Sequence, residues 1–324
     1  MDAWTWDGSG YPSLVGRDAS GAADGHMAAA TDWVDVGRWV DNFEPEDASG
    51  IALKPVTADG AIQGSTAEGQ VVQDNRTYGS SRVELAEGFS LAGNRYTGSD
   101  EKLNWFPIGV SSRPFSGIFE GNGNRLTDLR VDSVRNCQGL FGTVAGTLEK
   151  KAVVRGFELS GSVRSASSSV GGVAGQVYLA EIGDVAFTGD VTSLGGGAGG
   201  IAWFVSHETA LENVAFVGDV HGEGDQVGGI VGLSTTDSSI KNAYAAGSVT
   251  VSSGSARPDR GALVGEASGT SLTNCYWDSS KTGLAAIGES GDGNASADVS
   301  AKSADQFATG EVAWLLNPPD AHGD

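Results

Sequence analysis

Short segments in which every second residue is apolar recur through the middle of the chain. The most complete copy is residues 240–249, with the sequence Ile-Lys-Asn-Ala-Tyr-Ala-Ala-Gly-Ser-Val. Related copies are residues 211–220, 182–191 and 154–163, and weaker ones are residues 126–131 and 272–277. A period of two is typical of a β-strand whose alternate side chains face a core. Each copy therefore predicts a strand.

The copies are spaced almost evenly. Their leading aliphatic residues stand at positions 126, 154, 182, 211, 240 and 272, which gives steps of 28, 28, 29, 29 and 32 residues. Two positions in each strand are expected to face inward. They are filled by Leu129, Phe157, Val185, Val214, Ala243 and Cys275, and two residues later by Val131, Leu159, Phe187, Phe216, Ala245 and Trp277. One such unit cannot bury its apolar face alone, but a stack of units can.

A second recurrent element lies between the copies, and most of its copies read glycine, two apolar residues, glycine. It occurs at residues 139–142, 172–175, 200–203, 229–232 and 262–265. Two short strands per repeat, with glycines at the corners, predict a β-solenoid. The expected fold class is all-β: a parallel β-helix of about six coils, each 28–32 residues long, with equivalent residues stacked at roughly 4.8 Å along the axis.

The flanking regions lack this period. Residues 1–95 are expected to be a β-rich N-terminal region, with strand-like alternation at 33–40 and 82–85, and residues 96–278 form the solenoid. Residues 279–302, rich in Gly, Ser and Asp, predict a loop. In the last segment, 303–324, Ser303 and Gln306 make a capping-box pattern that predicts a short helix ended by Asn317-Pro-Pro. This helix is a candidate cap for the terminal coil.

The solenoid also predicts the state of both cysteines. Cys137 falls in the first coil and Cys275 in the sixth, so five coils separate them by about 24 Å along the axis. A disulfide needs Cα atoms within about 7 Å. We therefore expect two free thiols, with Cys275 facing inward.

Composition and charge exclude several classes of protein. The chain has 324 residues with 50 Gly and only 8 Pro, and 20 Lys plus Arg stand against 41 Asp plus Glu, a formal charge of -21. This acidity disfavours nucleic acid and anionic membranes as partners. The sequence has neither an apolar run of the roughly 18 residues that span a bilayer nor a signal-peptide pattern. Two Cys and four His leave little room for zinc or iron-sulfur chemistry.

At residues 228–232 and 242–249 the sequence resembles the GLUG-motif repeat, named for its Gly-Leu-hydrophobic-Gly core. Residues 105–109, 115–123 and 139–142 are similar to the usual lead-in to such repeats, and 276–278 and 307–317 to the usual ending. The resemblance covers roughly residues 83–317. It implies a right-handed β-helix displayed outside the cell, in secreted and cell-surface proteins of bacteria and some archaea. Family members include adhesin-like proteins and non-catalytic parts of some immunoglobulin-A peptidases, and the motif implies no catalytic residue.

The opening residues 4–14, Trp-Thr-Trp-Asp-Gly-Ser-Gly-Tyr-Pro-Ser-Leu, are similar to what commonly follows the Leu-Leu-Asn ending in this family. The resemblance therefore implies that the chain starts at the tail of one module and stops after the next. Under this interpretation it is a fragment of a longer array, and neighbouring modules of the same polypeptide are among its partners.

Asp190 and Asp219 are the best carboxylate pair. They occupy the same repeat position, with Ser162 and Ser248 in the flanking coils, and by alternation they point outward. Stacked one coil apart they would lie about 5 Å from each other, the separation of a retaining glycosidase pair. Three interpretations stay open: surface charge, a shared Ca²⁺ ion, and cleavage of a polysaccharide.

The acidic, glycine-rich segment 218–226 extends the calcium hypothesis. It offers Asp219, Glu223 and Asp225 as oxygen ligands, which with Asp190 make the candidate calcium set. A plain surface turn is the alternative, because the regular repeats of calcium-binding β-rolls are missing, and residues 290–298 have the same two interpretations. His207 beside Glu208, and His221 near Glu223, have no nucleophile motif beside them.

Four tryptophans, Trp4, Trp6, Trp33 and Trp39, fall before residue 40 and suggest either a sugar-binding platform or core filling. The leading functional hypothesis is a non-catalytic structural and interaction module of an extracellular, cell-surface protein. It would act as an adhesin-like stalk or a binding surface for a host or cell-surface glycan or protein. The alternatives are a polysaccharide-cleaving β-helix enzyme (glycoside hydrolase or polysaccharide lyase) using Asp190 and Asp219, and a spacer domain of a larger surface peptidase.

Overall fold

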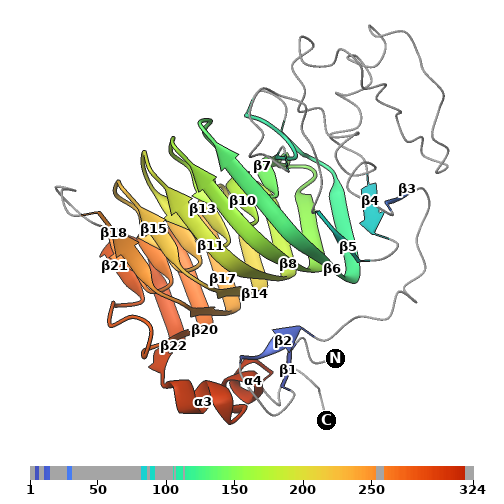
Figure 1. Cartoon of the computed structure of the whole chain (residues 1–324). Coiled ribbons are helices and arrows are strands. Elements are labelled where there is room, and N and C mark those ends of the chain that lie inside the picture. Colours follow the sequence, from blue (N-terminus) through green and yellow to red (C-terminus); the bar gives the residue numbers. More distant parts are fainter. Residues whose placement is uncertain are drawn as a thin grey trace, which may run out of the picture.

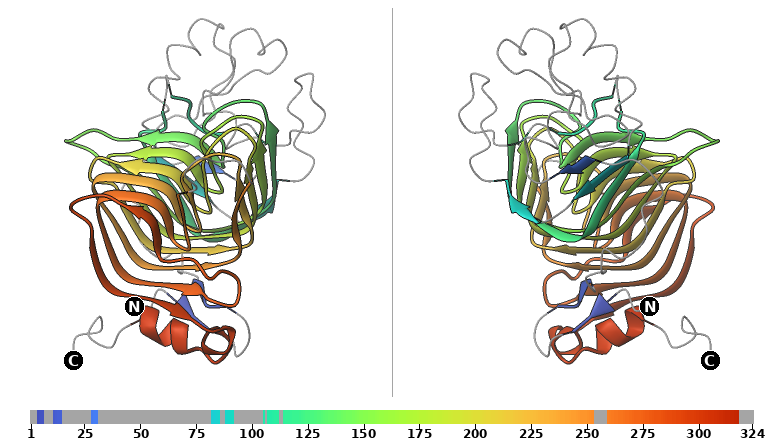
Figure 2. Two further views of the ribbon diagram at one scale, coloured as in Figure 1. Left: turned by 90° about the vertical axis from the view of Figure 1, so that its left-hand side faces the viewer. Right: turned by 90° about the vertical axis from the view of Figure 1, so that its right-hand side faces the viewer.

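The computed structural model describes residues 4–6, 11–14, 28–30, 82–85, 88–91, 105, 107–111, 114–252 and 259–317. These residues form a parallel β-solenoid of about five turns with two short helices beside it (Figure 1). Seen along the stack, the turns lie one behind another (Figure 2). Every strand pair in the solenoid is parallel, so the fold class predicted from the repeat is confirmed.

Each turn contributes up to three strand segments. The longest series is β6 (Ile118–Ser133), β8 (Ala152–Ser165), β11 (Ala180–Ser193), β14 (Ala210–Val217), β15 (Val220–Gly222), β17 (Val231–Ala246), β18 (Val249–Val251), β20 (Val264–Asp278) and β22 (Ala295–Lys302). The second is β7 (Phe141–Ala145), β10 (Ala174–Tyr178), β13 (Ala202–Ser206), the first residues of β17 and β20, and β21 (Ile287–Ser290). The third is β9 (Val170–Gly171), β12 (Ala198–Gly199), β16 (Val227–Gly228) and β19 (Arg260–Gly261).

The inward ladders follow the repeat from the second copy onward. Val185 pairs with Phe157 and with Val214, and Phe187 pairs with Leu159 and with Phe216. Phe187 and Phe216 stack with ring centroids 6.0 Å apart, and both are buried. The glycines of the second element make room for them, since a Cβ on Gly172 would lie 2.2 Å from the Phe187 ring. The apolar alternation therefore fills the interior of the coil.

The register of the first turn differs from the one expected. Phe119, not Leu126, pairs with Val154, while Leu126 pairs with Leu159 and Val131 with Val163. Two irregularities in β6, between Glu120 and Asn124 and between Leu126 and Leu129, cause the difference. An extra residue in one strand shifts every later pair, and the alternation of side chains alone does not reveal it.

A ladder of polar side chains supports one corner of the solenoid. Asp184, Asn213, Asn242 and Asn274 occupy this corner in successive turns, and all have left-handed backbones, with φ between 52° and 56°. The Asn213 amide donates to Asp184 Oδ1 at 2.9 Å, Asn242 to Asn213 at 3.2 Å, and Asn274 to Asn242 at 2.8 Å. Asn and Asp tolerate this conformation better than other residues with a Cβ. The corner therefore favours them for two reasons, the left-handed backbone and the hydrogen bonds between side chains.

The region before the solenoid is described in short strands: β1 (Trp4–Thr5), β2 (Ser13–Leu14), β3 (Ala28–Ala30), β4 (Arg82–Leu85) and β5 (Phe89–Ser90). The strand expected at 82–85 is confirmed, and β3 and β4 continue the parallel sheet in front of β6. The alternation at 33–40 lies outside the described residues. Within the part of the chain that the structure describes, β1 and β2 pair with each other, antiparallel, and with no other strand.

The prediction of a loop over 279–302 is wrong for its later part, most of which forms the strands β21 and β22. β21 pairs with the start of β20, and β22 with its end, so that Val299 lies beside Cys275. The segment is poor in apolar residues because its side chains are largely exposed. Parallel pairing with β20 uses backbone groups, which Ser, Ala and Gly supply as well as any residue.

The predicted capping box is confirmed at Ser303 and Gln306, but the single helix is wrong. The backbone forms α3 (Ala304–Ala308) and α4 (Glu311–Leu316), separated by Gly310 with φ of 80°. The helices also cover a lateral face rather than the end of the stack: Phe307, Val312 and Leu316 pack with the outward side chains of Tyr244 and Tyr276. The helices therefore bury the outward-facing aromatic side chains of Tyr244 and Tyr276 from solvent.

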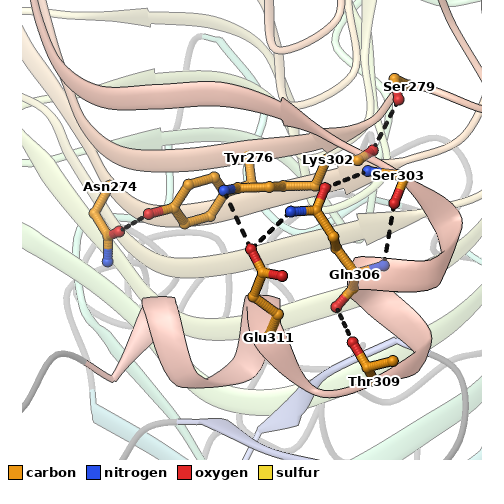
Figure 3. A network of polar contacts seen from close by, with 8 residues as sticks. All are labelled: Asn274, Tyr276, Ser279, Lys302, Ser303, Gln306, Thr309 and Glu311. Atoms are coloured by element: carbon orange, nitrogen blue, oxygen red, sulfur yellow. Dashed lines mark hydrogen bonds and ion pairs between the residues drawn. The ribbon is translucent and has the colours of Figure 1, made fainter.

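Polar contacts hold the helices against β20 (Figure 3). The Lys302 ammonium lies 5.1 Å from the centroid of the Tyr276 ring and 3.6 Å from Glu311. Gln306 donates to Glu311 Oε1 at 2.7 Å, and the Tyr276 hydroxyl donates to Asn274. Burial, with the nearby charge of Asp298, raises the pKa of Tyr276 to about 12, so this hydroxyl stays a neutral donor.

Both cysteines are free and buried, as expected from their separation along the axis. Cys275 faces the solenoid core, where its thiol contacts the carbonyl oxygen of Thr273 at 3.3 Å. Burial raises the pKa of this thiol to about 12. Because the thiolate is the reactive form, Cys275 is chemically inert in the folded protein.

Candidate functional site

The repeat register brings Asp190 and Asp219 to equivalent places on neighbouring turns. Asp190 lies opposite Ser162, and the residues that follow the two aspartates, Val191 and Val220, are paired. Both aspartate side chains are exposed. Asp219 Oδ1 accepts hydrogen bonds from the Ser248 amide at 3.1 Å and the Ser248 hydroxyl at 2.7 Å. This carboxylate therefore joins two turns of the solenoid.

Glu223 and Asp225 lie beyond the end of β15, and both side chains are exposed. The Glu223 amide bonds to the Ser193 carbonyl at 3.0 Å, which holds this segment to the preceding turn. In the part of the chain that the structure describes, no group of three or more His, Cys, Asp or Glu side chains comes together. Calcium prefers six to eight oxygen ligands. Binding of calcium by Asp190, Asp219, Glu223 and Asp225 therefore stays a prediction that needs a test in solution.

We expect millimolar calcium to leave the melting temperature of the protein unchanged, because exposed and dispersed carboxylates do not offer a closed set of ligands. Differential scanning calorimetry with calcium, and then with excess chelator, checks this. A saturable rise in melting temperature that the chelator reverses would show binding to the native state. Asp219→Asn and Glu223→Gln would then locate the ion at the candidate set.

The histidines considered in the sequence take part in contacts between turns. His207 Nδ1 lies 2.7 Å from the hydroxyl of Ser206, which also accepts a bond from Thr235 at 2.9 Å. Ser206 is buried. His221 lies 3.0 Å from the Thr250 hydroxyl and 3.3 Å from that of Ser252. The contacts of His221 join adjacent turns.

A cluster of aromatic side chains on the outside of β10 and β13 was missed by the sequence analysis. We call Tyr178, Trp203, Phe204 and His207 the aromatic patch. The rings form a connected series: Trp203 and Phe204 have centroids 5.6 Å apart, Phe204 and Tyr178 5.4 Å, and Tyr178 and His207 6.1 Å. The first three side chains are half-buried and His207 is exposed. Burial raises the pKa of Tyr178, so its phenol stays neutral.

One signal in the sequence pointed to this patch. Trp203 stands where the other four copies of the second element have glycine, at 142, 175, 232 and 265. Two glycines on adjoining segments make room for the indole, since a Cβ on Gly197 would lie 2.2 Å from Trp203 Nε1 and one on Gly232 2.7 Å from Cδ1. Glu266 follows Phe204 and Leu233 along the same row of the sheet, and it accepts a hydrogen bond from Gln226 at 2.8 Å.

Of the four early tryptophans, the structure describes Trp4 and Trp6, and Trp33 and Trp39 lie outside the described residues. Trp4 is 2% exposed and packs with Tyr244 in a small core outside the solenoid. It therefore fills space rather than offering a sugar-binding face.

One turn of the solenoid carries a known sequence signature. Residues 224–250 match the family model of the GLUG motif. The motif runs through β16 and β17 into β18, so it includes the glycines that pack under the neighbouring turn and Asn242 of the corner ladder. A GLUG motif thus describes one coil of this fold.

The remaining comparisons concern the whole chain. A crystal structure from Bacteroides ovatus described as a "putative immunoglobulin A1 protease" is 19% identical, and the match covers 76% of this chain and 85% of that chain with a TM-score of 0.45. No curated protein sequence matches the chain significantly. In the described residues, no helix has the length and apolar character needed to cross a bilayer.

Proposed function

We propose that this chain is a non-catalytic interaction module of an extracellular, cell-surface protein, in which a rigid solenoid displays the aromatic patch as a binding surface for a glycan. The observation that carries the proposal is the run of touching rings formed by Tyr178, Trp203, Phe204 and His207. A contiguous group of partly exposed aromatic rings on the surface of a fold marks an interaction site.

The support beneath the patch suits recognition without large rearrangement. Tyr178 and Phe204 belong to β10 and β13, which pair in register with each other and, on their outer sides, with β7 and β17. Trp203 is held in place by the glycines beneath its indole. A site on strands loses less conformational entropy on binding than one on a flexible loop.

A glycan fits this surface better than the other ligand classes. Aromatic faces pack against the apolar faces of sugar rings, and amide and carboxylate groups such as Gln226 and Glu266 hydrogen-bond to hydroxyls. With a net charge of -21 the chain repels nucleic acid and anionic lipid. A protein ligand is the main competing outcome of the test below.

The non-catalytic part of the proposal has its own control. A polysaccharide-cleaving enzyme that used Asp190 and Asp219 would lose cleavage in the double variant Asp190→Asn, Asp219→Asn. We expect neither the wild-type chain nor this variant to release reducing sugars or unsaturated products, and both to bind the same glycans. Asp219 instead joins its turn to Ser248.

We expect Trp203→Gly to abolish or weaken glycan binding by about tenfold or more while leaving the fold intact. Stacking on one aromatic ring contributes about 1.4 kcal/mol, which is roughly tenfold in affinity. Glycine is the residue that the other four turns carry at this position, so the variant adds no strain to the coil. A glycan array followed by calorimetric titration of the best binder measures the effect.

Trp314→Ala is the matched control, because Trp314 is 61% exposed on α4 and outside the patch. It should bind glycans as the wild type does. Equal binding by the wild-type chain and Trp203→Gly would contradict the proposal, as would an array without any binder. Capture of a protein ligand that Trp203→Gly also loses would keep the patch as the site and reject the glycan.

A further inference from the structure

A second apolar surface lies outside the solenoid and is covered by both ends of the described chain. Ala215, Tyr244, Ala246 and Tyr276 point outward from β14, β17 and β20, away from the main core. Over them lie the two helices and the N-terminal hairpin, which we define as β1 and β2 with Trp6, Tyr11 and Pro12 (Figure 1). We call the surface under the hairpin the acceptor site.

The hairpin is held in the acceptor site by aromatic packing. Trp4 and Tyr244 have ring centroids 5.4 Å apart, and Tyr11 and Phe307 meet edge to face at 5.1 Å. The Trp6 ring lies against the backbone between α3 and α4, since a Cβ on Gly310 would be 2.7 Å from it. Aromatic residues of this kind dominate the energy of peptide recognition.

Directed hydrogen bonds add specificity to this packing. The Asn317 side chain pairs with the Trp4 backbone in both directions: its Oδ1 accepts from the Trp4 amide at 3.2 Å, and its amide donates to the Trp4 carbonyl at 2.7 Å. The Tyr11 hydroxyl donates to Asp278 at 2.7 Å, and the Tyr244 hydroxyl donates to the Pro12 carbonyl. Asp278 is fully buried, so its carboxylate depends on such donors.

The hairpin contacts the acceptor site through its own residues, so these contacts do not require that the hairpin and the site belong to the same chain. In the described residues, β1 and β2 pair with each other and with no solenoid strand, whereas β3 joins the sheet beside β4. Thirteen residues, 15–27, connect Leu14 to Ala28. An element of this kind can be exchanged between copies at low cost, because every contact is kept and only the covalent connection changes.

We propose that the acceptor site is a peptide-docking site that takes the N-terminal hairpin of a second copy of this chain, so that copies are coupled by exchange of hairpins. The site shares no residue with the aromatic patch, and the inference does not depend on glycan binding. The ligand of this site is a short hairpin with two tryptophans and a Tyr-Pro pair. Its Trp4 backbone amide and carbonyl bond to the Asn317 side chain.

Two full-length variants test the proposal by complementation. The first, with Trp4→Ala and Tyr11→Ala, has a defective hairpin and an intact acceptor site. The second, with Tyr244→Ala and Asn317→Ala, has an intact hairpin and a defective acceptor site. Light scattering after gel filtration should find each variant monomeric alone and a one-to-one heterodimer in the mixture. A synthetic peptide of residues 1–14 should bind the first variant and raise its melting temperature, and a peptide with the same two alanines should not.

A mixture that stays monomeric overturns the proposal, whether or not the peptide binds, because a second copy then does not supply the hairpin. If either double variant fails to fold, the single variants Tyr11→Ala, which removes the hydrogen bond to Asp278, and Asn317→Ala, which removes the pair with Trp4, replace them in the same mixing experiment. A mixture of the single variants that stays monomeric likewise overturns the proposal.

Discussion

Gly189→Ala is expected to destabilise the solenoid by about 4 kcal/mol or more, which is the range of strain and overpacking combined. Gly161, Gly189, Gly218 and Gly247 stack in successive turns at the second corner of the long strands. A Cβ on Gly189 would lie 1.7 Å from the carbonyl oxygen of Gly161, and its φ of 150° disfavours any L side chain. The turns would have to separate to admit a methyl group.

Gly183→Ala is the matched control within the same strand, β11. The nearest atom to a Cβ there is the Glu212 carbonyl oxygen at 3.6 Å, an ordinary contact. We expect this variant to stay within about 1 kcal/mol of the wild type, because alanine lowers the entropy of the unfolded chain. Urea unfolding followed by circular dichroism compares the two. Equal stability of both variants would show that the stacked glycines do not set the spacing of the turns.

Asn213→Ala is expected to cost about 3–4 kcal/mol. The Asn213 side chain donates to Asp184 and accepts from Asn242, and each hydrogen bond contributes roughly 1 kcal/mol. Alanine at this corner would also adopt a φ of 55°, which costs a further 1–2 kcal/mol or so. The free energy of unfolding, again from urea titration, measures the sum.

Asn213→Gly separates the two contributions. Glycine accepts the left-handed backbone at little cost but cannot continue the ladder of side chains. It should therefore lose only the hydrogen-bond part, and fall between the wild type and Asn213→Ala. A glycine variant as unstable as the alanine variant would assign the whole effect to the ladder, and a neutral alanine variant would show that the ladder contributes nothing.

The regular part of the fold was predictable because one residue pattern is repeated. Phe187 and Phe216 fall at the same place in units 29 residues apart, and the structure pairs them. The prediction weakened where a unit departs from the pattern. The irregularities in β6 shifted the pairing of Leu126, and β22, made mostly of Ala and Ser, carries too few large apolar residues to indicate a strand.

The candidate sites were harder to find than the fold. The common position of Asp190 and Asp219 followed from the repeat, but the contact from Asp219 to Ser248 depends on side-chain direction. The sequence shows that Trp203 replaces a recurrent glycine. The other residues of the patch, such as Tyr178 and His207, stand at positions that follow no shared pattern. Sequence spacing does not show which outward side chains meet.

By itself, the sequence determined the parallel solenoid, its inward ladders, the capping box at Ser303 and the separation of Cys137 from Cys275. The solenoid, its ladders and the cysteine separation follow from spacing that the stack repeats, and the capping box follows from the local pattern of Ser303 and Gln306. Only the tertiary structure decided where the irregular ends go. Trp4 and Asn317 are 313 positions apart and still pair. Contacts between such distant segments leave no period in the chain, because they form once and depend on the shape of the finished surface.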